Sequence, residues 1–133
     1  MVSVLDTSAL LAALQGEPGQ EQVDAALLGG ECCMSTVNLA EFAGKCLAGG
    51  LADSDLERLL AGFNLTIHAF DCAQALTTGK LRATTRHLGL SLGDRACLAL
   101  AIELNATVIT ADRLWTQVAP LGIRIDCIRP DRH

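Results

Sequence analysis

The chain has 133 residues and a mass of 14.0 kDa, a size typical of one domain, so we expect residues 1–133 to fold as a single domain. Hydrophobic residues make up 50% of the sequence and charged residues 19%, which excludes a chain that is disordered throughout. The net charge of −5 excludes a polycation that binds nucleic acid through bulk charge, although it allows a local basic rim.

Two further features of the sequence bear on where the protein works. The uninterrupted apolar run over residues 96–102 is shorter than the roughly 20 residues that a membrane-spanning helix needs, and Asp6 interrupts the N-terminus before a signal peptide could form. The six cysteines are scattered and include no Cys-x-x-Cys pair, which favours reduced, buried thiols over disulfides or a zinc site. We therefore expect a cytoplasmic protein that has no membrane contact.

Short apolar runs alternate with helical patterns along the chain, and glycines separate them. In chain order we expect a strand at 2–5, helices at 9–14 and 18–28, a strand at 32–34, helices at 37–47 and 53–62, a strand at 65–70, helices at 71–87 and 91–104, a strand at 107–110, a short helix at 114–118 and a strand at 123–127. Strands separated by helices predict an α/β fold with a central parallel sheet of about five strands. Ligands of such sheets bind beyond the carboxyl ends of the strands, so polar residues that follow strands are the candidate functional residues.

Four acidic residues occupy such positions. Asp6 and Asp112 each follow a predicted strand, Glu41 lies in the first turns of the helix after the second strand, and Asp94 opens the apolar helix. Each has a purely structural interpretation when it is taken alone. Asp6 and Asp112 could cap helices, Asp94 could complete a capping box with Ser91, and Glu41 could pair with a lysine one helical turn later.

The four acids are more informative as a set, because all of them fall at one edge of the predicted sheet. Carboxylates that are gathered closely repel one another, and a fold tolerates this repulsion when protons or cations lie between them. Ligands that are all oxygen, with no paired histidines or cysteines, favour Mg²⁺ or Mn²⁺ over zinc. Such an ion activates water and neutralises charge on a phosphodiester, so the predicted reaction is phosphodiester hydrolysis.

Four segments carry a resemblance to a known family. They are Leu5–Ala12, Asn38–Glu41, Leu90–Ala101 and Thr110–Trp115. In order, spacing and total length they resemble the four signature segments of PIN-domain ribonucleases, and most closely the VapC toxins. The resemblance spans nearly the whole chain.

The resemblance implies a three-layer PIN-like fold, a Mg²⁺- or Mn²⁺-dependent endoribonuclease, a homodimer and inhibition by a VapB-type antitoxin. Transfer RNA or a ribosomal RNA loop is the substrate that the family suggests. Matched position by position, the catalytic and metal-binding residues are Asp6, Glu41, Asp94 and Asp112. Ser8 and Thr110 match hydroxyl positions that support the carboxylates. Leu114 stands where some PIN domains have a further acid, which leaves a second metal ion with fewer ligands.

Arginines are the candidates for contacts with the RNA. Arginine outnumbers lysine eight to two, and its guanidinium suits two-point contacts with phosphate. The candidates near the predicted site are Arg82, Arg86, Arg95 and Arg113. An ordinary solvated surface is the alternative interpretation for each of them.

A different class of function competes with the nuclease, namely a non-catalytic PIN-like module that binds RNA or a protein. The presence of all four acids disfavours this alternative. A phosphatase of the haloacid-dehalogenase type is a third option, but it requires an aspartate where Ser8 stands.

Overall fold

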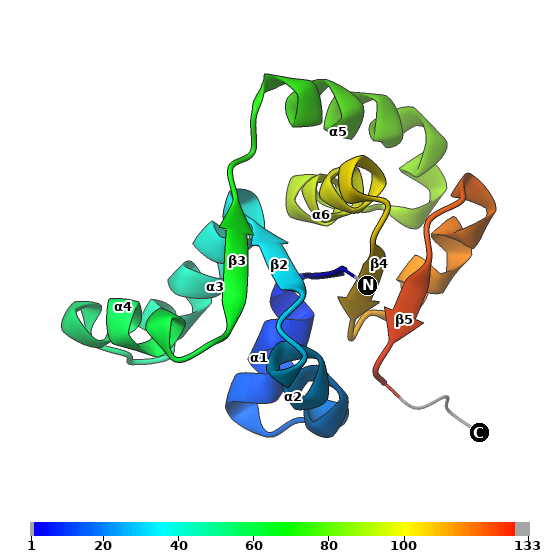
Figure 1. Cartoon of the computed structure of the whole chain (residues 1–133). Coiled ribbons are helices and arrows are strands. Elements are labelled where there is room, and N and C mark those ends of the chain that lie inside the picture. The colour runs from blue at the N-terminus through cyan, green and yellow to red at the C-terminus, as the bar shows by residue number, and fades with distance from the viewer. Residues whose placement is uncertain (1, 130–133) are drawn as a thin grey trace.

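The computed structural model describes residues 2–129 and shows a central sheet of parallel strands in the order β3-β2-β1-β4-β5 (Figure 1). The strands are β1 (Ser3–Leu5), β2 (Cys32–Ser35), β3 (Leu65–His68), β4 (Thr107–Thr110) and β5 (Ile125–Cys127). The α-helices are α1 (Thr7–Gln15), α2 (Gln20–Leu28), α3 (Thr36–Ala48), α4 (Asp53–Ala61), α5 (Cys72–Thr84) and α6 (Leu92–Leu104). Two 3-10 segments complete the fold, η1 (Arg86–Leu88) and η2 (Arg113–Leu121). The predicted α/β class and five-stranded parallel sheet are confirmed.

Helices cover both faces of the sheet. Successive residues of a strand face opposite sides, and apolar strand residues face both sides of this sheet. In β1, Leu5 packs in the core with residues of α1, α2 and α3, whereas its neighbour Val4 packs with residues of α6 and η2. In β4, Ile109 and Val108 divide in the same way. The sheet therefore separates two apolar cores, and the predicted three-layer arrangement is confirmed.

The carboxyl ends of the strands determine which segments meet at the candidate site. Asp6 directly follows β1, α3 directly follows β2, and Asp112 follows β4 by two residues. The helix α6 packs behind β1 and β2 and also contacts α3. Because β1 lies between β2 and β4, the ends of these three strands bring segments that are far apart in sequence to one edge of the sheet.

Six predicted boundaries were wrong by two or three residues. Three of them are the start of α1 at Thr7, the end of η2 at Leu121 and the start of β5 at Ile125. Local hydrogen bonds explain two of the others. The helix predicted to run to residue 87 ends at Thr84, where the hydroxyls of Thr84 and Thr85 both bond the carbonyl of Leu81 and compete with the helical ladder. The strand predicted to run to residue 70 ends at His68, and the N–H of Phe70 bonds the Thr36 hydroxyl instead of a neighbouring strand.

Another wrong boundary is the start of α2. The sequence predicts a start near Pro18, whereas the helix begins at Gln20 after Gly19, whose φ is 97°. A Cβ at Gly19 would come within 2.7 Å of Ile128, so the close approach and the positive φ both require glycine there.

Two predictions about composition can also be compared with the structure. All six cysteines are free, and Cys32, Cys33, Cys46 and Cys97 are buried. Cys72 is exposed and Cys127 is half-buried, so the expectation of buried thiols is wrong for these two. Over residues 2–129, no helix combines the length and the apolar character that crossing a membrane requires.

Candidate functional site

Asp6 is a buried carboxylate at the junction of β1 and α1. Only 4% of the residue is exposed, and its side chain caps α1 by accepting a hydrogen bond of 2.9 Å from the backbone N–H of Ala9. The hydroxyl of Ser8 donates to both carboxylate oxygens, at 2.8 and 2.9 Å, and the hydroxyl of Thr110 donates at 2.6 Å. The capping interpretation is therefore correct, and in addition the two hydroxyls predicted to support the carboxylates both bond this one.

The protonation of Asp6 is determined by opposing effects. Burial raises the pKa of its carboxyl from an ordinary value of 3.8 to about 6, even though the hydrogen bonds from Thr110, Ala9 and Ser8 lower it. The negative charge of Asp94 also contributes to this raised pKa. A positive charge next to Asp6 would relieve both the repulsion and the cost of burial.

Glu41 is held in place by contacts between α1, α3 and α6. The Asn38 amide donates to the Glu41 carboxylate over 3.2 Å and to the carbonyl of Gly93 over 3.1 Å, and the hydroxyl of Thr7 lies 3.4 Å from the same carboxylate. A Cβ placed on Gly93 would overlap the Glu41 carboxylate. The glycine therefore provides the space in which Glu41 lies against the start of α6, one residue before Asp94.

Asp94 completes the capping box that the sequence predicts. The Ser91 hydroxyl accepts a bond from the N–H of Asp94 over 3.1 Å, and the Asp94 carboxylate accepts one from the N–H of Ser91 over 3.0 Å. The negative charge of Asp94 is also one of the causes that raise the pKa of Asp6. One carboxylate thus takes part both in the cap and in the acidic surroundings of Asp6.

Cys97 is a buried thiol whose pKa is affected by three of the acids. Its thiol is completely buried on α6, and burial is the largest cause of its raised pKa. The carboxylates of Asp6, Asp94 and Glu41 raise this pKa further, in that order among the acids. Carboxylates from three separate segments of the chain therefore act electrostatically on one buried group.

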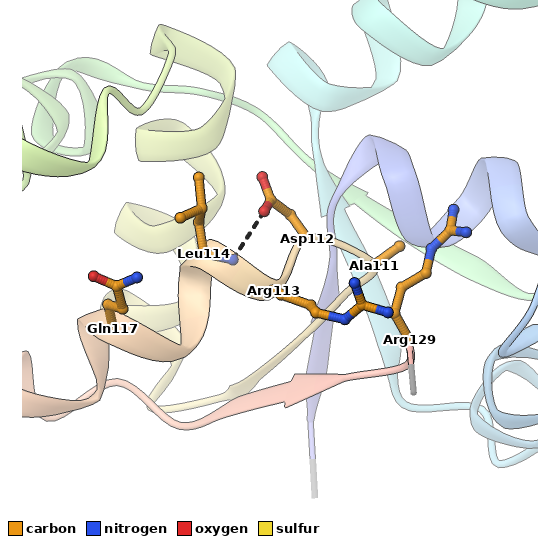
Figure 2. A pocket seen from close by; sticks show the side chains of 6 residues that line it. All are labelled: Ala111, Asp112, Arg113, Leu114, Gln117 and Arg129. Carbon is orange, nitrogen blue, oxygen red and sulfur yellow. Dashed lines mark hydrogen bonds between the residues drawn. The ribbon is translucent and has the colours of Figure 1, made fainter. Parts of the chain in front are cut away.

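Asp112 is linked to Asp6 through the hydroxyl of Thr110. The backbone N–H of Asp112 donates to the Thr110 hydroxyl over 3.0 Å, and that hydroxyl donates in turn to Asp6. The Asp112 carboxylate accepts a bond of 2.9 Å from the N–H of Leu114, as the dashed line in Figure 2 shows. In this arrangement the backbone of Asp112 is linked to Asp6, while its side chain bonds to the start of η2.

The acids fit a divalent cation by donor type and charge. They offer only oxygen ligands, which Mg²⁺ and Mn²⁺ prefer. The pKa of Asp6 is raised mainly by burial and also by the charge of Asp94, and a bound cation would counter both effects. Among residues 2–129, however, no three acidic, histidine or cysteine side chains already lie close enough together to hold a metal ion. The acids are therefore of the right chemical type to bind Mg²⁺ or Mn²⁺, but they do not form a preorganised coordination site.

The predicted arginines lie in different surroundings. Arg82 and Arg86 are exposed, on α5 and at the start of η1. Arg95 donates to the carbonyl of Thr78 over 3.0 Å, which turns its guanidinium towards α5. Arg113 is half-buried and lines a hollow together with Asp112.

Sequence reasoning did not select three residues that the structure places at the site. Thr7 and Asn38 contact Glu41, and Arg129 lines the same hollow as Asp112. A signal was available for Arg129, because it follows β5 by two residues, as Asp112 follows β4. The contacts of Asn38 had no such signal, since they depend on how α3 packs against α6.

The fold and the site together define a class of protein, an α/β domain with a parallel sheet and acidic residues beyond the carboxyl ends of its central strands. The family model of the PIN domain matches residues 3–120 of this chain. Because that match covers most of the sequence, the chain belongs to the PIN-domain family.

Solved structures with the same fold come from several bacteria. A chain of the DNA-bound VapBC from Salmonella typhimurium is 22% identical, with a TM-score of 0.71 over 96% of this chain and 98% of that one. A chain of VapBC2 from Rickettsia felis, bound to a promoter DNA fragment, is 20% identical, with a TM-score of 0.75 and the same coverage of 96% and 98%. A chain of VapBC-5 from Mycobacterium tuberculosis is 24% identical, with a TM-score of 0.63 over 97% and 98% of the two chains. No protein with a curated description matches the chain.

Proposed function

We propose that this PIN domain is a VapC-type toxin that hydrolyses RNA with a divalent metal ion. The contacts that carry the proposal bring separate segments of the chain together. The Thr110 hydroxyl bonds Asp6, and the Glu41 carboxylate lies against Gly93, the residue before Asp94. Membership of the PIN-domain family and the fold shared with chains of VapBC complexes support the same function.

The residues proposed to hold Mg²⁺ or Mn²⁺ are Asp6, Glu41, Asp94 and Asp112. When bound, such an ion supplies an activated water and neutralises charge on the phosphodiester. The chain's own contribution is the orientation of the ligands. Ser8 and Thr110 bond the oxygens of Asp6, and Asn38 bonds Glu41, so these two carboxylates lose little freedom when they bind a cation.

RNA is the proposed substrate, and either transfer RNA or a ribosomal RNA loop would suit a protein that carries net negative charge but exposes a few arginines. Arg82 and Arg86 are exposed, and Arg113 lies beside Asp112, so these three are the proposed phosphate contacts. Arg95 is a weaker candidate because its guanidinium bonds the carbonyl of Thr78. An RNA substrate of this kind would place the protein in the cytoplasm.

Two partners belong to the proposal. A VapB-type antitoxin is proposed because chains that share this fold occur in VapBC complexes. A homodimer is proposed from the resemblance to VapC toxins. Light scattering of the purified chain tests the dimer, and co-purification with the product of a small neighbouring gene tests the antitoxin.

Cleavage of RNA by purified variants tests the proposed reaction. With Mg²⁺ or Mn²⁺ present, Asp6→Asn and Asp94→Asn should each lower the rate of RNA cleavage by about 100-fold or more, because each removes a charge that the reaction requires. Asp24→Asn changes an exposed carboxylate on α2 and is the matched control, which should cleave at the parent rate.

The outcome also separates the two classes of function. Equal cleavage by the parent and both site variants would trace the activity to a contaminant and contradict the assignment. RNA binding without cleavage and without metal binding would favour a non-catalytic module. One observation points towards that alternative, because the carboxylates of Asp94 and Asp112 both bond backbone N–H groups of their own turns.

A further inference from the structure

A pair of arginines, Arg113 and Arg129, lies beside Asp112 at the end of the sheet. The strands β4 and β5 are parallel neighbours with Thr110 opposite Cys127, and the N–H of Ile128 bonds the carbonyl of Thr110 over 2.9 Å. The ladder therefore continues one residue beyond β5. This register places Arg129 next to the segment that carries Asp112 and Arg113.

The two arginines and Asp112 line one hollow of about 550 Å³. Figure 2 shows the Arg113 side chain reaching across to Arg129, with both arginines on one side of Asp112 and with Leu114 and Gln117 on the other. A second hollow of about 480 Å³ shares both arginines in its lining and extends to the start of α2. The guanidiniums thus lie between the carboxylate of Asp112 and the surface near α2.

Arg129 can bind an anion without breaking a strong contact. Its guanidinium lies 3.6 Å from the Glu17 carboxylate, and the two side chains are 31% and 36% exposed. An ion pair that is this long and this exposed contributes little stability, so an incoming anion competes with a weak partner. When no anion is bound, the ion pair with Glu17 holds the Arg129 guanidinium near the hollow.

Three other arginines contact groups away from this hollow. Arg95 bonds the carbonyl of Thr78, and Arg124 bonds Thr107 and the carbonyl of Asn105 near the amino ends of β4 and β5. Arg58 lies on α4 and pairs with Asp55. Arg113 and Arg129 are therefore distinguished by sharing a hollow with one of the candidate acids.

We propose that Arg113 and Arg129 form a phosphate subsite, which binds an RNA backbone phosphate next to the one that is cut. The proposal rests on the proposed ribonuclease function and deepens it, because it assigns a role to Arg129 and a direction to the RNA strand. A strand that crosses the carboxylates presents a further phosphate on each side of the cut. The subsite receives the phosphate on the side of η2 and β5, away from Arg82 and Arg86 on the α5 side.

Binding of RNA to an inactive protein tests the subsite separately from cleavage. The Asp6→Asn variant serves as the background, and the probe is a short fluorescein-labelled single-stranded RNA of mixed sequence. In fluorescence anisotropy, adding Arg129→Ala should weaken the affinity about three- to tenfold, because charge-assisted hydrogen bonds to phosphate are lost. The slope of log affinity against log salt should fall by about 0.7, the value for one phosphate contact with a single strand.

Three further variants exclude trivial explanations. Arg124→Ala removes a charge at the amino end of β5, away from the hollow, and should change neither the affinity nor the slope. Glu17→Gln removes the ion pair with Arg129 and should leave RNA binding equal or tighter. Arg129→Lys keeps the charge but not the two-point contact, so its affinity should lie between those of the parent and Arg129→Ala.

The outcomes distinguish failure of the subsite from failure of the proposed function. RNA cleavage by the parent together with unchanged RNA binding by Arg129→Ala overturns the subsite alone. If the parent neither cleaves nor binds RNA, the proposed function and the subsite both fail. A loss of affinity for polyglutamate without a loss for RNA would assign the arginines to an acidic protein and would also overturn the subsite.

Discussion

Asp6 carries a stability cost that the protein accepts at the position where the proposed metal binds. Its carboxyl is almost fully buried, and its pKa is raised to about 6 despite three hydrogen-bond donors. Protonation therefore stabilises the folded state relative to the unfolded one, in which the pKa is near 3.8. The stabilisation from this group is complete below pH 3.8 and is lost as the pH rises through about 6.

An Asp6→Asn variant should reveal this loss in metal-free buffer. Because asparagine stays neutral, the variant should gain in unfolding free energy relative to the parent as the pH rises from 4 to 7, by up to about 3 kcal/mol. Urea unfolding of both proteins in the presence of EDTA measures the difference at each pH. A difference that stays flat across this range would show that the Asp6 carboxylate is not strained by its surroundings.

At the scale of elements, the approach of α3 to α6 positions Glu41. Asn38 spans the two helices with bonds to Glu41 and Gly93, and the missing side chain of Gly93 provides the space for the carboxylate. These contacts require an amide on α3 and a glycine in the first turn of α6. Both residues therefore serve the position of Glu41 as well as the packing of the helices.

Gly93→Ala tests this arrangement. The added methyl should displace the Glu41 side chain and lower RNA cleavage about tenfold or more, while the unfolding free energy stays within about 1 kcal/mol of the parent because the flexible Glu41 can move. Gly79→Ala in α5 is the matched control, since a Cβ there meets no atom within 4 Å. The control should keep full cleavage activity and gain about 0.5–1 kcal/mol in stability. Full activity in Gly93→Ala would contradict the role assigned to the glycine.

The same two helices show which features the sequence can predict. The Ser91–Asp94 capping box and the position of Asp6 after β1 were correct, because both depend on residues within one turn of each other. The bonds of Asn38 could not be predicted, because they form only when α3 and α6 meet. Helix ends were predicted less well where threonine hydroxyls bond the backbone, as Thr85 does at the end of α5.

At the scale of the whole molecule, the parallel sheet brings the distant segments together. The order β2-β1-β4 places the ends of three strands side by side, and the segments that follow these strands carry Asp6, Glu41 and Asp112. The alternation of strands and helices in the sequence predicts a parallel sheet but not the order of its strands. The strand order does not determine the direction of each side chain. Asp112 reaches the neighbourhood, yet its carboxylate bonds the N–H of Leu114, a choice that depends on the local turn into η2.

Whether the acids act together is the central claim, and binding of Mn²⁺ tests it most directly. Calorimetric titration of the purified parent at pH 7 should detect a Mn²⁺ site, and saturating Mn²⁺ should raise the melting temperature, because binding to the folded state stabilises it. Asp6→Asn and Asp94→Asn should each weaken that binding at least about tenfold, whereas Asp24→Asn should bind as the parent does. Absence of a Mn²⁺ site in the parent, or equal binding by all four proteins, would contradict the claim.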